Sequence, residues 1–435
     1  MPFTLVGGIF LFKKYMIILY NIIFRILYFF SFVLKPFLPK FKEREKNVSL
    51  SIQSLTKLDH NRNKIWFHSA SVGEFEQAKP IIELLKSKYH DIQIICSFFS
   101  PSAYKTQAKY EYADSIFYLP LDLPSKSKYI INLIKPDIVV FVRYELWANY
   151  LYILKKYNIP TFLINATAPN SNFFNKTLLM KSFYKFVFSL FHTIFAVNND
   201  HCKFFQQLNV KSDIKLLPDT RFDRIIQKVE TAKSKPIIST DSFSDKFIFV
   251  AGSIWEKDFE IISDALINYN SNNFNKITSI LVPHEPKEDF LQSIEKIFPN
   301  AIRLSKLLSE PQAIQSGGVV LVDSVGKLLM LYSNANFAYV GGAFGVGVHS
   351  LTEPAGYGIP VACGPNCLNS PDAKPMLDCK ALSIIHSSDE FNRWLTELIN
   401  NSAIYNTCSE ASRNYVYSKV GSSEKFVEFL SHFLK

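Results

Sequence analysis

Short apolar runs alternate with amphipathic segments along most of the chain, and this alternation constrains the fold more than any other feature. The run 137–142 is nearly all β-branched, which is typical of a strand buried on both faces of a parallel sheet. Alternating strands and helices predict parallel sheets with helices on both sides. We expect strands at 65–70, 92–97, 116–119, 137–142, 161–165 and 193–197, and again at 247–251, 278–283, 319–322, 337–340 and 359–362.

The length of the chain predicts more than one domain. A chain of 435 residues, 48% of them hydrophobic, can bury two cores. The polar stretch 228–246 is predicted to link an N-terminal domain over 47–227 to a C-terminal domain over 247–435, whose last helix can return to the N-terminal domain. Two Rossmann-like domains facing a cleft predict the α/β fold class of GT-B glycosyltransferases, with ligand-facing loops after the strand ends.

Residues 16–34 form an apolar segment that, with the basic flank up to residue 46, predicts an N-terminal membrane-anchor helix. As a helix it would extend roughly 28 Å, close to the thickness of a bilayer core. Asn21 and Arg25 share one face, which is costly in lipid, so both a spanning and an interfacial helix remain open. No small-residue cleavage site follows, which argues against a signal peptide. The basic flank favours a cytoplasmic globular part, and Met16 is an alternative start to Met1.

The charge and the cysteines exclude several classes of protein. A net charge of +10 favours anionic partners. No Arg/Gly-rich tail or RNA-binding aromatic signature occurs, so nucleic acid is not expected as a partner. The six cysteines show no CxxC pair or zinc-ligand spacing, which predicts reduced thiols.

The stretch 338–365 is rich in glycine and predicts a ligand site. Seven of the fifteen glycines lie within residues 341–364, and Gly341 and Gly342 directly follow an expected strand. Glycine lets the backbone approach a ligand closely, and a helix start then offers N–H groups to an anion. His349 and Glu353 follow, and Glu353 can accept hydrogen bonds from a sugar hydroxyl. Such a turn suits a nucleotide sugar.

The loop after the first expected strand carries a candidate base. Ser71 can cap the following helix, and Gly73 permits a tight turn. Glu74 then lies at the strand end, where a carboxylate can act as general base on a hydroxyl. The alternative is that Glu74 only favours the helix dipole.

A second carboxylate, Glu145, follows the strand 137–142 in a polar cluster. The alternative for this cluster is a buried ion pair beside a core tryptophan. The other members of the cluster are Arg143, Trp147 and Asn149.

Further candidates follow strands of the second half. Gly252 and Ser253 suit phosphate contacts through backbone N–H groups and a hydroxyl. His284 can contact a base or a phosphate, or be a surface histidine. Before the linker, Arg221 can face an anion or be a solvated surface arginine.

Eight short motifs follow one another along the chain, at 71–74, 145–149, 221–223, 251–253, 281–283, 323–328, 340–342 and 353–355. Taken in order, they resemble the 3-deoxy-D-manno-octulosonic acid (Kdo) transferase family of lipid A assembly. The resemblance covers nearly the whole chain. It implies a GT-B fold and inverting transfer of Kdo from CMP-Kdo to an anionic tetraacylated lipid A precursor at the cytoplasmic face of the inner membrane.

The resemblance also implies roles for residues. Glu74 would be the general base, Glu145 would support the acceptor or the base, and Glu353 would contact a donor hydroxyl. No metal or other cofactor is implied, and no Asp-x-Asp triplet occurs. The other donor-side positions are Gly252, Ser253, His284, Gly341, Gly342 and His349, and the acceptor-side or anion-binding positions are Ser71, Gly73 and Arg221.

Some positions depart from the family pattern. His284-Glu285 stands where an Arg-His pair is common, Ser350 replaces an asparagine, and Arg143 replaces a glutamate.

Two alternative functions stay open: a membrane-attached GT-B transferase with another nucleotide sugar or lipid-linked acceptor, and a GT-B-like scaffold without turnover. The number of Kdo units and the oligomeric state are not predicted.

Overall fold

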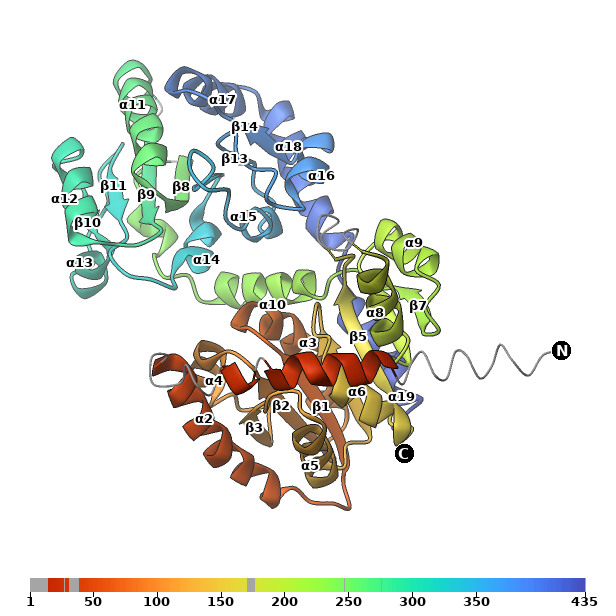
Figure 1. Cartoon of the computed structure of the whole chain (residues 1–435). Helices are drawn as coiled ribbons and strands as arrows, with labels where there is room; N and C mark the ends of the chain where they lie inside the picture. Colours follow the sequence, from red (N-terminus) through yellow and green to blue (C-terminus); the bar gives the residue numbers. More distant parts are fainter. Residues whose placement is uncertain are drawn as a thin grey trace. The chain divides into compact units, whose positions relative to one another are not determined.

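The computed structural model describes residues 15–26, 28–30, 39–169, 177–245, 247–274 and 276–434 (Figure 1). The chain divides into two compact units. Unit 1 comprises Met1–Arg224 and Gly421–Lys435, and unit 2 comprises Ile225–Val420. Each unit contains a parallel sheet with helices around it, so the predicted pair of Rossmann-like α/β domains is confirmed.

The strands of unit 1 form one parallel sheet in the order β3-β2-β1-β4-β5-β6-β7. β1 and β4 lie side by side in the middle, and both faces of β4 are buried, as its β-branched sequence predicts. The bounds are β1 Asn63–Ser69, β2 Ile92–Phe98, β3 Ser115–Tyr118, β4 Ile138–Val142, β5 Thr161–Ala166, β6 Thr193–Ala196 and β7 Asp213–Leu216.

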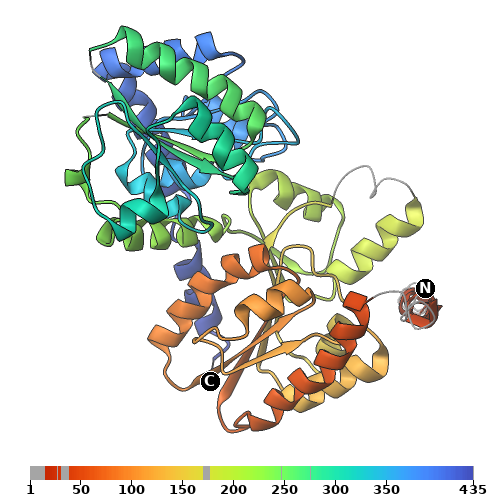
Figure 2. The same ribbon diagram turned by 90° about the vertical axis from the view of Figure 1, so that its left-hand side faces the viewer.

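Helices cover both faces of this sheet (Figure 2). Trp66 and Phe141 face a core with α5, α6, α8 and α9, whereas Phe67 and Val140 face a core with α3, α4 and α19. The bounds are α2 Pro39–Ile52, η2 Gln53–Lys57, α3 Val72–Lys88, α4 Pro101–Gln107, α5 Pro124–Ile134, α6 Ala148–Lys156, α8 Leu178–Phe188, α9 Asn199–Gln207 and α19 Ser422–Ser431.

The sheet of unit 2 is also parallel, in the order β10-β11-β9-β8-β12-β13-β14. Its strands are β8 Phe247–Ile254, β9 Ile277–Pro283, β10 Ile302–Arg303, β11 Val319–Leu321, β12 Phe337–Val340, β13 Val361–Cys363 and β14 Leu382–Ile384. Its helices are η3 Thr240–Ser242, α11 Glu256–Asn272, α12 Glu288–Ile297, α13 Leu304–Ser309, α14 Leu328–Leu331, η4 Tyr332–Asn334, α15 Thr352–Gly356, α16 Ala373–Asp378, α17 Ser388–Asn400 and α18 Ser402–Tyr417.

Every strand expected from the sequence is present, but β7, β10 and β14 were not predicted. β7 is mostly exposed and contains Asp213 and Lys215, so it lacks an apolar run. β10 and β14 have only two and three residues. These edge strands depend on a neighbouring strand rather than on their own sequence.

The predicted linker 228–246 is wrong in its first part, because α10 (Arg221–Ser234) runs through it. Ile225, Val229 and Ala232 recur at helical spacing and are 8%, 0% and 2% exposed. Charged residues lie between these apolar positions, so the composition of the segment alone suggests a polar linker.

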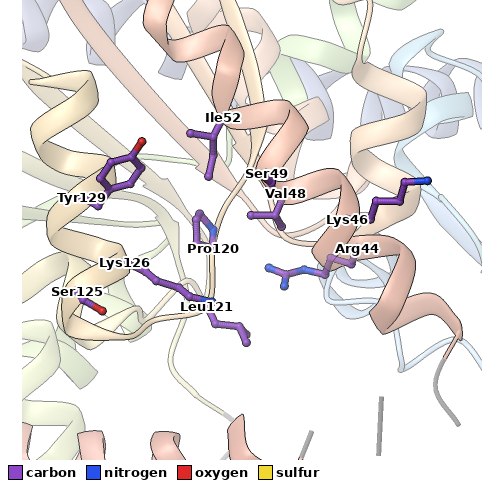
Figure 3. A pocket seen from close by; sticks show the side chains of 10 residues that line it. All are labelled: Arg44, Lys46, Val48, Ser49, Ile52, Pro120, Leu121, Ser125, Lys126 and Tyr129. Atoms are coloured by element: carbon purple, nitrogen blue, oxygen red, sulfur yellow. The ribbon is translucent and has the colours of Figure 1, made fainter. Parts of the chain in front are cut away.

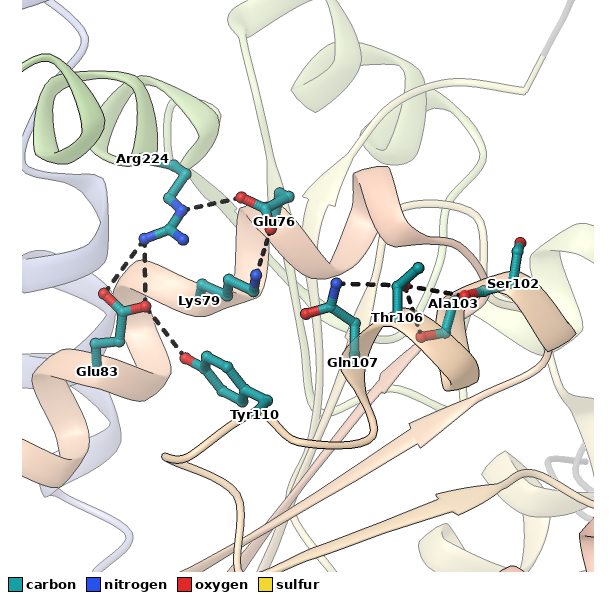
Figure 4. A network of polar contacts seen from close by, with 9 residues as sticks. All are labelled: Glu76, Lys79, Glu83, Ser102, Ala103, Thr106, Gln107, Tyr110 and Arg224. Atoms are coloured by element: carbon teal, nitrogen blue, oxygen red, sulfur yellow. Dashed lines mark hydrogen bonds and ion pairs between the residues drawn. The ribbon is translucent and has the colours of Figure 1, made fainter. Parts of the chain in front are cut away.

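The first turn of α10 is fixed to α3 by ion pairs (Figure 4). Arg224 donates from Nε to Glu76 Oε2 at 3.0 Å and from Nη1 to Glu83 Oε1 at 3.2 Å. Lys79 also contacts Glu76, and the hydroxyl of Tyr110 donates to Glu83. This network holds the chain in place at the end of unit 1.

Asp223 holds the start of α19, and we expect its loss to destabilise unit 1. Its carboxylate accepts from Gly421 N at 2.6 Å, Ser423 N at 2.7 Å and Ser423 Oγ at 2.6 Å. Asp223→Ala leaves these buried donors unsatisfied and should lower the free energy of unfolding by about 1–3 kcal/mol, with a smaller loss for Asp223→Asn. Urea unfolding measures this, and an unchanged midpoint for Asp223→Ala would contradict it.

The N-terminal segment is helical at 15–26 and 28–30 and packs on unit 1. Tyr20 donates to Asp122 Oδ2 at 2.8 Å, and Asn149 Nδ2 donates to Asn21 Oδ1 at 2.8 Å. Burial raises the pKa of Asp122 to about 6, opposed by hydrogen bonds from Asn149, Tyr20, Ser127 and Tyr150.

The predicted anchor 16–34 lies partly outside the described residues, which exclude 27 and 31–34. Within the part of the chain that the structure describes, no helix has the length and apolar character needed to cross a bilayer. The membrane anchor therefore stays a prediction.

Candidate active site

Glu74 lies where β1 passes into α3, and the local sequence positions it as a capping residue. Ser71 is the N-cap, and its Oγ accepts from Glu74 N at 3.3 Å. In return, Glu74 Oε2 accepts from the backbone N–H groups of Ala70 at 2.7 Å and Ser71 at 3.1 Å. The other oxygen, Oε1, has no hydrogen-bond partner among the described residues. Capping therefore engages one oxygen and leaves the other available to a substrate.

The environment of Glu74 favours its protonated form more than water does. Burial raises the pKa of Glu74 above its usual value, and the charge of Glu145 raises it further. Hydrogen bonds from Ser71 and Ala70, and the nearby His68, act in the opposite direction. A half-buried carboxylate with a raised pKa is suited to accept a proton near neutral pH.

Glu145 lies in the loop after β4 and is only 9% exposed. Its Oε2 contacts Nε2 of His68 at 3.0 Å and accepts from Nε1 of Trp147. Because β1 and β4 are neighbours in the sheet, Glu74 and Glu145 reach the same edge, as the sequence predicted for polar residues at strand ends.

Gly73 does not form the tight turn predicted for it. It lies in the first turn of α3, and its φ is not positive. A Cβ placed there would meet nothing within 4 Å. Gly73 and the N-cap Ser71 are both exposed, so the surface beside Glu74 is open to solvent.

The polar cluster expected around Glu145 is split by the structure. Arg143 adopts a left-handed φ of 64°, and its Nη2 lies 3.9 Å from Asp219 Oδ2. Arg221 approaches the same oxygen with Nε at 3.4 Å. Asn149 instead bonds to Asp122. The two arginines therefore lie around one carboxylate, near the end of β4 and the start of α10.

In unit 2, the candidate residues gather at the ends of β8, β9 and β12, which are neighbours in the sheet. The ring of His284 stacks on Trp255 at 4.7 Å and on His349 at 4.3 Å. Trp255 Nε1 donates to His349 Nε2 at 3.2 Å. Burial lowers the pKa of His349, and His284 lowers it further. The neutral ring thus carries its proton on Nδ1, where it can donate to a ligand.

Asp258 ties the glycine-rich loop to α11. It is 1% exposed, and its Oδ2 accepts from Gly342 N at 2.8 Å and Trp255 N at 3.0 Å. Its Oδ1 accepts from the hydroxyl of Tyr339 at 2.8 Å. One buried carboxylate therefore holds both the glycine-rich loop and Trp255, the residue on which His284 stacks.

Other candidates have different surroundings. Gly252 lies inside β8, where a Cβ would come within 2.3 Å of the Tyr332 hydroxyl oxygen, so its small size serves packing. Ser253 is half-buried with a left-handed φ of 55°. Glu353 lies on α15; burial raises its pKa, opposed by the charge of Lys228. No contact in the described part of unit 2 joins Glu353 to the histidine stack.

His68, Ser97, Trp255, Asp258 and Asp122 were not predicted as site residues. Trp255 and Asp258 follow the end of β8 at the start of α11, so their place at a strand end was a usable signal. Among the described residues, no group of three or more His, Cys, Asp and Glu side chains is placed to hold a metal ion.

Two parallel α/β units with polar groups at the carboxyl ends of their central strands define a GT-B-like fold. The solved structures with this fold include UDP-GlcNAc 2-epimerase from Neisseria meningitidis bound to UDP-GlcNAc, with a TM-score of 0.61 and 14% identity over 85% of this chain and all of that one. MurG from Acinetobacter baumannii has a TM-score of 0.53 and 12% identity, covering 85% of this chain and 99% of that one.

Sequence comparison gives the family. A family model described as "3-Deoxy-D-manno-octulosonic-acid transferase (kdotransferase)" matches residues 40–224. The 3-deoxy-D-manno-octulosonic acid transferase of Aquifex aeolicus is 30% identical over 370 residues, covering 84% of this chain and 90% of that protein. Its counterpart in Haemophilus influenzae is 25% identical over 393 residues, covering 85% and 87%. The chain belongs to the Kdo transferase family and is a glycosyltransferase of that family.

Proposed function

We propose that this protein transfers Kdo from CMP-Kdo to the tetraacyldisaccharide precursor of lipid A, lipid IVA, with inversion at the anomeric carbon and with Glu74 as general base. The observation that carries the proposal is the geometry of Glu74. One carboxylate oxygen caps α3, the other has no partner among the described residues, and the raised pKa suits a proton acceptor.

The reaction follows as a single displacement. The acceptor hydroxyl gives its proton to Glu74 Oε1 while its oxygen attacks the anomeric carbon of Kdo. The bond from that carbon to the phosphate oxygen of CMP breaks, and CMP leaves with the electron pair. Attack opposite the leaving group inverts the configuration. Glu74 then returns the proton to water.

A groove in unit 1 supports a lipid acceptor with anionic groups. It has a volume of about 680 Å³ and lies between α2 and α5 (Figure 3). Cationic side chains and apolar side chains share its lining, which suits acyl chains next to a phosphate. The lining residues are Arg44, Lys46, Val48, Ser49, Ile52, Pro120, Leu121, Ser125, Lys126 and Tyr129.

The groove is linked through aromatic rings to Glu145, the charged neighbour of the candidate base. The guanidinium of Arg44 lies 4.2 Å from the ring centre of Phe99, and that ring lies 5.0 Å from the ring of Trp147. Trp147 in turn donates to Glu145. An acceptor with its chains in the groove would therefore extend toward Glu145 and Glu74.

We place the enzyme at the cytoplasmic face of the inner membrane. The N-terminal helix exposes one apolar face, which an interfacial or spanning segment would bury in lipid. Lys46 on α2, which is exposed, would then meet anionic headgroups. The exposed apolar residues are Ile18, Leu19, Ile22, Ile23, Ile26, Phe29 and Phe30.

The donor assignment is tested by nucleotide binding. Titration calorimetry should show that the full-length protein binds CMP more tightly than UDP. His349→Gln should weaken CMP binding, because it removes the stacked ring at the end of β12. His386→Gln, at an exposed histidine of the same unit, is the matched control. Tighter binding of UDP would favour the alternative of a transferase using another nucleotide sugar.

We expect the pH dependence of the reaction to report Glu74. Only the deprotonated base is active, so kcat/KM should fall as the pH drops through its pKa. Since that pKa is raised, the acidic limb should lie above the usual glutamate value. Glu145→Gln removes a charge that raises it and should move the limb to lower pH. A limb that stays in place in Glu145→Gln would contradict this account.

We expect Gly73→Ala to keep the fold and lose activity. Alanine favours the first turn of α3 and meets no neighbour, so the melting temperature should not fall. The new side chain occupies the bare surface where the acceptor approaches Glu74, and kcat/KM should fall at least about tenfold. Gly73→Val should lose more. Full activity in both variants would place the acceptor elsewhere.

A further inference from the structure

A chain of buried hydrogen bonds lies behind the candidate base. Trp66 and His68 lie two residues apart on β1, and Ser97 stands opposite His68 on β2. Trp66 Nε1 donates to Ser97 Oγ at 2.8 Å, and Ser97 Oγ lies 2.8 Å from Nδ1 of His68. Trp66 and His68 are fully buried, and Ser97 is 1% exposed. Water therefore does not compete for these groups.

The donors and acceptors in this chain fit in only one order. An indole N–H can only donate, so Ser97 Oγ accepts from Trp66. Within the described part of the chain, the hydroxyl of Ser97 has His68 Nδ1 as its remaining partner. A buried hydroxyl proton requires an acceptor, so it is given to Nδ1. The imidazole then carries its proton on Nε2.

This tautomer matches the next contact. Nε2 of His68 lies 3.0 Å from Glu145 Oε2, which also accepts from Trp147. In this tautomer, Oε2 of Glu145 accepts hydrogen bonds both from Nε2 of His68 on β1 and from Nε1 of Trp147 in its own loop. The opposite tautomer would set a lone pair of Nε2 against that oxygen.

We propose that Ser97 and His68 are positioning residues, which fix the His68 tautomer and so orient the carboxylate of Glu145 beside Glu74. Ser97 acts through His68, and His68 through Glu145; neither touches the substrate. The inference rests on the proposed function, since it concerns the base of that reaction. It adds residues on β1 and β2 that act on the pKa of Glu74 through Glu145.

The charged groups near His68 and Glu145 come from several elements. Glu74 lies on α3, and the charge of Glu145 raises its pKa. His68 lies on β1 and contacts Glu145. Arg143, on the loop of Glu145, is directed to Asp219. Arg44 from α2 donates to the carbonyls of Leu119 and Phe99.

The tautomer can be measured without any assay of transfer. Nitrogen-15 NMR of the full-length protein labelled at histidine distinguishes the two ring nitrogens, and His68→Gln assigns the signal by its disappearance. From the hydrogen-bond order we expect a proton on Nε2 and none on Nδ1. In Ser97→Ala this preference should weaken. A proton on Nδ1 of His68 in the wild type would overturn the proposal.

The effect on the base is measured by the pH profile. In Ser97→Ala, the carboxylate of Glu145 is less firmly oriented beside Glu74 and its charge should raise the pKa of Glu74 less, so the acidic limb of kcat/KM should move to lower pH by about half a unit. kcat should fall about tenfold, with KM for CMP-Kdo unchanged. Ser97→Thr keeps the hydroxyl and should restore the wild-type limb.

The matched control is Ser115→Ala. Ser115 is a buried serine on the adjacent strand β3, and its hydroxyl bonds Ser54 outside the chain of Trp66, Ser97 and His68. Ser97→Ala behaving like Ser115→Ala would overturn the proposal. If the wild type transfers no Kdo, the proposed function fails, and the tautomer measurement still decides the inference.

Discussion

Glu74→Gln should lose transfer activity by two orders of magnitude or more, the contribution expected of a general base. The amide keeps the size of the side chain, and its oxygen can still accept from Ala70 and Ser71, so α3 stays capped. It cannot take the proton of the acceptor hydroxyl. The loss should therefore appear in kcat, with CMP binding unchanged because the residues that we propose for donor binding belong to unit 2.

The matched control is Glu76→Gln, two residues further along α3. Glu76 pairs with Arg224 and Lys79, so its variant affects the ion-pair network without reaching the candidate base. Initial rates of the two variants, at equal folded concentration, give the comparison. Equal activity in Glu74→Gln and Glu76→Gln would remove Glu74 as the base and leave Glu145 as the next candidate.

Gly341→Ala should destabilise unit 2 and weaken nucleotide binding. A Cβ at Gly341 would lie 2.4 Å from the carbonyl oxygen of Ser253 and 2.7 Å from Cα of Ile254. Both are backbone atoms of β8, so no side-chain rotation relieves the clash. The ends of β8 and β12 must separate, which should cost about 1–3 kcal/mol and displace the loop that Asp258 holds.

Gly345→Ala is the control within the same loop. Its φ is not positive, and the nearest atom to an added Cβ lies 3.6 Å away. Urea unfolding and CMP titration should show large losses for Gly341→Ala and small ones for Gly345→Ala. Similar values for the two variants would mean that the loop does not depend on close contact between β8 and β12.

The central strands and the capping of α3 were predictable because both are local. The β-branched run of β4 and the spacing of Ser71 and Glu74 carry their own signal. The two interpretations of Glu74, as an acid that favours the helix dipole and as a candidate base, are compatible in the structure, because capping of α3 engages only one carboxylate oxygen.

The relations between strands were not predictable in the same way. Ser97 meets His68 only because β2 pairs with β1 in one particular register, and no motif in the sequence records that pairing. Arg143 was expected beside Glu145, but its left-handed backbone turns it toward Asp219 instead. Contacts of this kind depend on the assembled sheet.

Product formation by the purified full-length protein tests the proposed transfer of Kdo to lipid IVA. The protein is incubated with CMP-Kdo, generated in the reaction, and lipid IVA in detergent micelles, and the lipid product is examined by mass spectrometry. We expect a lipid carrying added Kdo, together with released CMP. A folded protein that binds CMP but yields neither would contradict the proposed transfer.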